Sequence, residues 1–196
     1  MRLFLSILVL MFSLQSWTKA DDIRDFEIEG MSVGDSLLKF INEDDILSNI
    51  IKYPYTSKKY YATSITESKY LKSYESLEVY LKKNDKKYII YSIDAANFYK
   101  NKKKCLKKMD QIKVEISKIF STLAAQDKKK MVNLGDPSGK SIYYRTSWII
   151  NNRDFVAIEC SFWSQEMKDK YNFGDHIRVS VTKKELDDWL TYEAYE

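Results

Sequence analysis

The chain has 196 residues, 44% of them hydrophobic, and a formal net charge of +4. This hydrophobic content excludes a disordered chain, and the length suffices for one domain with a sizeable buried core. Because 32 basic residues are nearly balanced by 28 acidic ones, the charge gives no case for a nucleic-acid partner.

The first residues have the layout of a cleavable secretory signal. Arg2 precedes an apolar run over residues 3–14, and Thr18-Lys19-Ala20 follows with small side chains where a signal peptidase reads them. The run is shorter than the roughly 20 apolar residues that cross a bilayer, and no later stretch predicts a membrane helix. We expect cleavage near Ala20, with residues 1–20 as signal peptide and residues 21–196 as a single globular domain, periplasmic or secreted.

Short elements are predicted at the start of the mature chain. Weak alternation over residues 25–31 predicts a strand. Ser32 and Asp35 have the spacing of a capping box at a helix start. Asn42 is placed to cap a second helix, which ends before Pro54.

Alternating segments dominate the rest of the chain. Alternation of apolar and polar residues predicts strands over residues 60–65, 75–82, 86–94, 142–150, 155–163 and 176–182. Residues 127–140 are polar and rich in glycine, so they are expected to form a loop. Residues 182–185 spell a capping box that opens a closing helix.

Adjacent hairpins favour an antiparallel sheet over a parallel one. The predicted fold class is α+β, with a mostly antiparallel sheet built from hairpins. One long amphipathic helix, over residues 99–123, and short terminal helices are expected to pack on one face of that sheet.

Cys105 and Cys160 are predicted to form a disulfide. Cys105 begins the apolar stripe of the long helix, and Cys160 lies on the apolar side of the strand over residues 155–163. Both sulfurs should therefore point into the interface between helix and sheet. An even count in an exported chain favours a disulfide over two buried thiols. Two cysteines and one histidine lack the spacing of metal ligands, so no metal and no cofactor is expected.

Gly34-Asp35-Ser36-Leu37 resembles the nucleophile block of the GDSL-type esterases and lipases. The resemblance implies a serine esterase with Ser36 as nucleophile. Such an enzyme needs a base from an Asp-x-x-His block, but the residue three before His176, the only histidine, is Phe173. A capping role for Ser32 and Asp35 explains the segment instead.

The segment over residues 135–141 resembles a phosphate-binding P-loop that is one residue short between its glycines. A P-loop must lead into a helix, so that the helix N-terminus faces the phosphate. Here a strand is predicted next, which favours a simple polar turn.

Tyrosine is abundant, with 15 residues. A possible ligand groove is assigned to Tyr53, Tyr55, Tyr60, Tyr61, Tyr143 and Tyr144. The alternative, that these side chains fill half-buried strand positions, stays open. The lysines at positions 100, 102, 103, 104, 107 and 108 form either a solvated helix face or a basic patch for an anionic membrane surface.

The chain resembles a family of small exported proteins from AT-rich marine alphaproteobacteria over residues 26–38 and 86–94, in its two cysteines, and in its ending, Asp188-Trp189 with Glu193-Ala194-Tyr195. That family has no assigned activity, so the resemblance implies the compartment and a single domain, and no chemistry.

The sequence therefore predicts a non-enzymatic binding or interaction module of the cell envelope, with an envelope protein or a small ligand as partner. A serine esterase using Ser36 and a membrane-surface scaffold using the lysine-rich helix are the alternatives.

Overall fold

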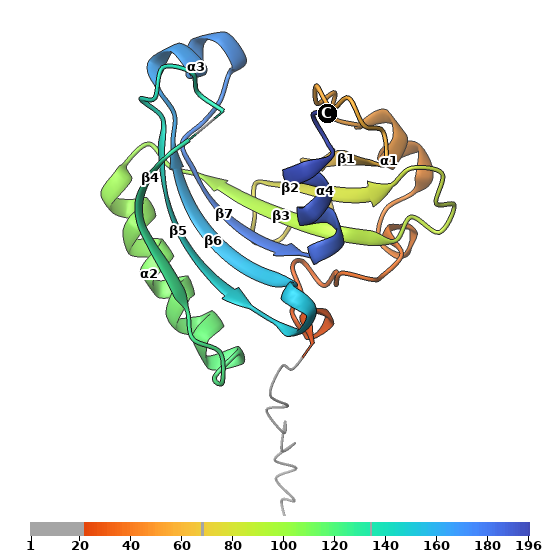
Figure 1. The fold of residues 1–196 in the computed structure, drawn as a ribbon. Coiled ribbons are helices and arrows are strands. Elements are labelled where there is room, and N and C mark those ends of the chain that lie inside the picture. Colours follow the sequence, from red (N-terminus) through yellow and green to blue (C-terminus); the bar gives the residue numbers. More distant parts are fainter. Residues whose placement is uncertain (1–21, 68, 134) are drawn as a thin grey trace, which may run out of the picture.

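A computed structural model describes residues 22–67, 69–133 and 135–196. The predicted signal peptide, residues 1–20, lies outside them. A single seven-stranded sheet has the order β1-β2-β3-β7-β6-β5-β4, and all neighbouring strands are antiparallel (Figure 1). The strands are β1 (Tyr60–Ile65), β2 (Ser76–Lys82), β3 (Ile90–Phe98), β4 (Gln126–Val132), β5 (Ile142–Ile149), β6 (Phe155–Phe162) and β7 (His176–Thr182). The predicted α+β class with an antiparallel sheet is confirmed.

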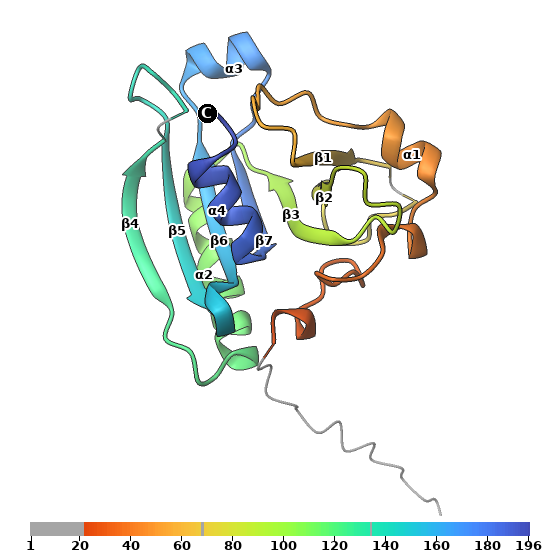
Figure 2. The ribbon, with the colours of Figure 1, turned by 45° about the vertical axis from the view of Figure 1, so that its right-hand side comes forward.

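The sheet is strongly curved, and its two faces carry different helices. Figures 1 and 2 show α2 (Lys102–Ile119) outside the curve and α4 (Lys184–Tyr192) inside it. We call these the convex and concave faces. The expectation that all helices pack on one face is wrong, because the concave face also carries apolar side chains that a helix must cover.

The convex face holds the larger core. Cys105, Met109 and Ile116 of α2 are buried against apolar residues of the central strands. The sulfurs of Cys105 and Cys160 are 2.02 Å apart, so the two expected cysteines join α2 to the middle of the sheet. The helix forms because its apolar residues recur at intervals of three and four positions. Asn101 caps it by accepting a hydrogen bond from the backbone N–H of Lys104.

A smaller core lies on the concave face around Trp189. This side chain is fully buried, and its ring centroid lies 5.0 Å from that of Tyr55 and 5.2 Å from that of Tyr60. The predicted capping box at the start of α4 does not form. Asp154 instead accepts a hydrogen bond of 2.8 Å from the backbone N–H of Lys184, and Glu185 accepts one of 2.6 Å from the hydroxyl of Tyr60.

Three local predictions need correction. Residues 25–31 form no strand, since a 3₁₀ turn at Ile23–Asp25 precedes a tight turn that pairs Ile28 with Met31. Asp35 does accept a hydrogen bond from the backbone N–H of Ser32, but the helical turn that follows spans only residues 37–39. The expected loop over residues 127–140 begins with β4. An edge strand needs little apolar surface, and its lysines discourage pairing with another sheet.

The helix α3 (Gln165–Tyr171) was not predicted, although Ser164 caps it by accepting a hydrogen bond from the backbone N–H of Met167. It leads into β7 through Asn172, whose φ of 56° ends the helix in the left-handed conformation.

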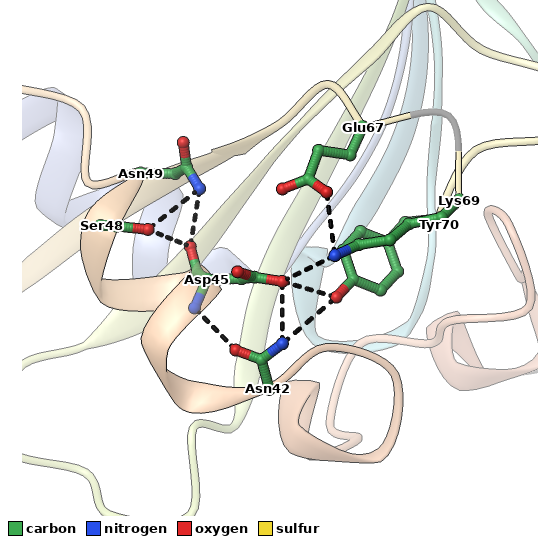
Figure 3. Close-up of polar contacts among 7 residues, drawn as sticks. All are labelled: Asn42, Asp45, Ser48, Asn49, Glu67, Lys69 and Tyr70. Carbon is green, nitrogen blue, oxygen red and sulfur yellow. Dashed lines mark hydrogen bonds and ion pairs between the residues drawn. The ribbon is translucent and has the colours of Figure 1, made fainter.

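The predicted cap of the second helix is confirmed and belongs to a wider polar network (Figure 3). Asn42 accepts a hydrogen bond of 2.8 Å from the backbone N–H of Asp45 at the start of α1 (Glu43–Ser48). The hydroxyl of Tyr70 donates to Asp45 over 2.7 Å, and Lys69 forms ion pairs with Asp45 and Glu67. These contacts fasten the connection between β1 and β2 onto α1. In the described part of the chain, no helix has the length and apolarity to cross a membrane.

Candidate functional site

Four charged side chains that line one pocket lie on the concave face, on the neighbouring strands β2, β3, β7 and β6. Glu78 of β2 is directly opposite Asp94 of β3, and Arg178 of β7 is directly opposite Glu159 of β6. Each residue stands between two apolar neighbours in sequence, so strand alternation sends the apolar pair to the convex core and the charged side chain to the concave face.

Arg178 joins this row through ion pairs. Its Nη2 lies 3.2 Å from Oε1 of Glu159, and its Nη1 lies 3.7 Å from Oδ2 of Asp94. The side chains of Glu159 and Asp94 are only 10% and 14% exposed. Burial disfavours the charged guanidinium, but the carboxylates of Glu159, Asp94 and Glu78 outweigh burial and raise the pKa of Arg178. Arg178 therefore stays charged.

Glu78 is held by a tyrosine. The hydroxyl of Tyr53 donates a hydrogen bond of 2.7 Å to Oε2 of Glu78. Burial raises the pKa of Glu78 above its usual range, and the nearby charge of Asp94 adds to this shift. The hydrogen bond from Tyr53 and the charge of Arg178 act in the opposite direction. Three carboxylates thus surround one guanidinium, which gives a formal charge of −2 when all four groups are ionised.

These charges line a pocket of about 410 Å³, which we call the concave pocket. Aromatic side chains form much of its wall, and they come from both of its ends. Tyr53 and Tyr55 lie 5.1 Å apart between ring centroids at one end, and Trp163 and Phe173 lie 4.5 Å apart at the other. The further lining residues are Ser76, Glu78, Tyr80, Asp94, Ala96, Phe98, Asn133, Glu159, Ser161, Asn172, Gly174, His176 and Arg178.

His176 contributes a neutral acceptor to the pocket. Its Nδ1 lies 2.9 Å from the carbonyl oxygen of Gly174. A carbonyl only accepts, so we assign the proton to Nδ1 and the lone pair to Nε2. Burial lowers the pKa of His176 below its ordinary value, which keeps the imidazole neutral at pH 7.

Gly174 determines where the ring of Phe98 lies beside His176. A Cβ atom at this position would lie 2.7 Å from Cδ1 of Phe98, which is closer than the two atoms can approach. The ring of Phe98 in turn contacts that of His176 edge to face, with 6.2 Å between centroids. The absence of a side chain at Gly174 therefore lets Phe98 lie against the backbone at the mouth of the pocket.

The six tyrosines assigned to a ligand groove are not brought together. Tyr53 and Tyr55 line the concave pocket, whereas Tyr60 and Tyr61 line a separate, more open hollow near the β2–β3 turn. Tyr143 and Tyr144 are neighbours on β5, and alternation sends them to opposite faces of the sheet. Tyr55 and Tyr60 are also buried members of the concave core.

Ser36, the serine of the GDSL-like segment, lies far from the only histidine. It bridges Ile89 just before β3, whereas His176 pairs with Phe98 at the far end of the same strand. At about 3.3 Å per residue, nine residues separate them by roughly 25–30 Å. The hydroxyl of Ser36 donates to the carbonyl of Lys87. His176 is therefore not placed to act as a base for Ser36.

The P-loop-like segment is a turn built around Asp136. This buried carboxylate accepts hydrogen bonds from the backbone N–H groups of Ser138 and Ser141 and from the hydroxyl of Ser141. The hydrogen bond from the Ser141 hydroxyl is the main reason why the pKa of Asp136 is lowered. Backbone donors that would hold a phosphate are therefore used by the protein's own carboxylate, and the strand β5 follows as expected.

The lysines at the start of α2 are on the convex side of the sheet, away from the concave pocket. Lys103, Lys104 and Lys107 are exposed. Lys102 donates a hydrogen bond of 3.0 Å to the hydroxyl of Tyr144 and lies over its ring. Within residues 22–67, 69–133 and 135–196 no group of three or more histidine, cysteine, aspartate or glutamate side chains is arranged to hold a metal ion.

No known family, curated protein or solved structure matches the chain. The concave pocket is the feature of the molecule that indicates a function. Sequence reasoning missed its charged row, although a signal is present. Leu77-Glu78-Val79, Ile93-Asp94-Ala95, Ile158-Glu159-Cys160 and Ile177-Arg178-Val179 share one pattern, a charged residue between two apolar ones in mid-strand.

Proposed function

We propose that the protein is a non-enzymatic binding module that works outside the cytoplasm and holds a small organic ligand in the concave pocket. The observation that carries this proposal is the pocket itself, in which aromatic walls surround a row of largely buried charged groups. Its volume of about 410 Å³ falls in the range of small-molecule sites. Apolar walls with a few fixed polar groups are also typical of such sites.

The polar contacts in the pocket favour binding over covalent catalysis. Ser161 lies opposite His176 in the sheet, but its hydroxyl donates a hydrogen bond of 2.7 Å to Glu159 and not to the imidazole. Glu159 is itself held by an ion pair with Arg178. A serine hydroxyl needs a base to become a nucleophile, and this arrangement does not provide one.

The two cysteines support the proposed location. Their sulfurs are at bonding distance and both side chains are fully buried. Disulfides persist in the periplasm and outside cells and are rare in the cytosol. Export also agrees with the signal-like layout of residues 1–20, which lie outside the described residues.

The proposal can be tested with a pocket-filling variant. Ala96 lines the concave pocket on β3, opposite Arg178, so Ala96→Phe should fill part of it without removing a polar contact. Gln111→Phe adds the same ring to the exposed surface of α2 and serves as the control. A panel of small cationic, neutral and anionic aromatic compounds would be screened by saturation-transfer NMR and thermal shift.

We expect at least one class of compound to bind the unmodified protein and the Gln111→Phe control, and to lose binding to Ala96→Phe. If no compound in the panel binds, or if binding survives the filling of the pocket, the proposed function is wrong.

A further inference from the structure

We infer that the ligand of the concave pocket is a small organic cation, with a protonated amine attached to an apolar group. This inference rests on the proposed function and names the class of ligand that the site takes. The same cavity presents three carboxylates, one guanidinium and several aromatic rings, so its walls suit both parts of such a molecule.

The guanidinium of Arg178 is already paired with two carboxylates. Its two terminal nitrogens already face Glu159 and Asp94. Its Nε is shielded from solvent and has no hydrogen-bond partner among the described residues, so a ligand in the pocket does not reach it. An anionic ligand would therefore meet three carboxylates beside a guanidinium that is already paired with two of them, which opposes its binding.

The pocket is rich in acceptors. Tyr53 donates to Oε2 of Glu78, which leaves the lone pairs of Oε1 for a donor on the ligand. His176 adds Nε2 as a second acceptor, because its Nδ1–H donates a hydrogen bond to the carbonyl oxygen of Gly174. A primary ammonium carries three N–H donors and accepts nothing, so its hydrogen-bonding groups match those that the wall presents.

The aromatic walls supply the remaining attraction. A cation within about 6 Å of a tyrosine or tryptophan ring is attracted by the negative face of that ring. Tyr53 and Tyr55 flank the acidic row at one end, and Trp163 and Phe173 stand at the other. The rings also cover the apolar part of the ligand, which a hydrated inorganic cation lacks. This combination distinguishes an organic cation from a metal ion.

The burial of the three carboxylates favours the binding of a cation. Removing like charges from water is unfavourable unless an opposite charge pairs with them. Among the residues that line the concave pocket, Arg178 supplies one positive charge for Glu78, Asp94 and Glu159, so the lining carries more negative than positive charge. Arg145, which lies opposite Glu159 on β5, lines a neighbouring hollow and not this pocket. A bound ammonium would restore part of the balance, and its affinity should fall as salt concentration rises.

The test compares three aromatic probes of similar shape, of which one is a cation, one is neutral and one is an anion. Benzylamine, benzyl alcohol and benzoate would be titrated into the full mature chain by calorimetry, together with alkylammonium probes and their matched alcohols. We expect benzylamine to bind about ten-fold more tightly than benzyl alcohol, with no binding of benzoate. Glu78→Gln and Asp94→Asn should each weaken benzylamine binding about ten-fold and leave benzyl alcohol nearly unchanged.

Glu166→Gln removes the same charge from an exposed site on α3 and is the matched control. Both pocket variants remove a buried charge and keep the shape, so they should remain folded, and thermal unfolding would check this. If neutral probes or benzoate bind as well as the ammonium probes, the inference is overturned while the proposed function stands. If no probe of any charge binds, both fail.

Discussion

The hydroxyl of Tyr53 donates a hydrogen bond of 2.7 Å to the carboxylate of Glu78, and so ties the segment before β1 to the middle of β2 on the concave face. The two residues are 25 positions apart in sequence. The bond gives a largely desolvated carboxylate a donor and places an aromatic ring at the edge of the acidic row.

The first prediction concerns this bond. Tyr53→Phe removes the donor and leaves the ring, so Glu78 loses its hydrogen bond in a site that water reaches poorly. Loss of a hydrogen bond to a buried charged group costs about 1 to 3 kcal/mol of the free energy of unfolding. Urea unfolding at pH 7 would measure it. Tyr192→Phe, at a side chain that is 67% exposed, is the control and should change nothing. Equal stabilities of the two variants would show that the bond is unimportant.

The second prediction concerns pH. The pKa of Glu78 is raised from 4.5, chiefly by burial, so the folded state binds its proton more tightly than the unfolded state does. The resulting stability is fully present below pH 4.5 and is lost as the pH rises through the pKa of the folded state. Tyr53, Asp94 and Arg178 face Glu78 from the neighbouring elements and help to set that pKa.

Glu78→Gln keeps the acceptor for Tyr53 and removes the titration. The melting temperature of this variant minus that of the unmodified protein should therefore increase from pH 4 to pH 7. Glu166→Gln should show no such trend. A difference that stays flat or decreases with pH would mean that Glu78 is as well solvated when folded as when unfolded.

Sequence patterns predicted the scaffold better than the site. Alternation located six of the seven strands, and the spacing of Cys105 and Cys160 within their elements indicated that both face one core. The strand β4 was not predicted, because an edge strand rich in lysine has no alternation of apolar residues to detect. The placement of α4 on the concave face depends on the curvature of the whole sheet, which no local pattern encodes.

The row of charged side chains on the concave face was not predicted for a related reason. A charged residue between two apolar ones in a strand usually faces solvent, and Glu78 or Arg178 alone looks ordinary. Only the register of four strands shows that these side chains lie side by side. The curvature of the sheet and α4 then enclose them. Of the six tyrosines predicted for a groove, Tyr53 and Tyr55 line the concave pocket, whereas Tyr143 and Tyr144 are not among its lining residues.

The third prediction concerns the disulfide. Cys105 and Cys160 are 55 residues apart, and closing a loop of that length stabilises a fold by about 4 kcal/mol in the chain-entropy model. The double variant Cys105→Ser, Cys160→Ser should lose stability of that order, and its urea unfolding should no longer respond to a reductant. Unmodified protein that unfolds at the same urea concentration with and without the reductant would contradict this.

The fourth prediction concerns the mouth of the concave pocket. A Cβ atom added by Gly174→Ala would lie 2.7 Å from Cδ1 of Phe98, so the ring must move. Phe98 is 49% exposed and has room to turn outward, which keeps the cost in stability below about 1 kcal/mol. The same movement breaks the contact between Phe98 and His176 and opens the wall on which a ligand would rest.

Benzylamine binding should therefore weaken several-fold in Gly174→Ala while the melting temperature changes little. Gly135→Ala is the comparison variant, because the added Cβ would meet only the side-chain oxygen of Asn133, at 3.2 Å, and Asn133 lines the pocket without belonging to its aromatic wall. Gly174→Ala displaces the ring of Phe98, which belongs to the aromatic wall beside His176, whereas Gly135→Ala displaces only the amide of Asn133. If both bind benzylamine as the unmodified protein does, Phe98 does not contribute to the ligand contact, and the pocket must hold its ligand through the rings of Tyr53, Tyr55 and Trp163.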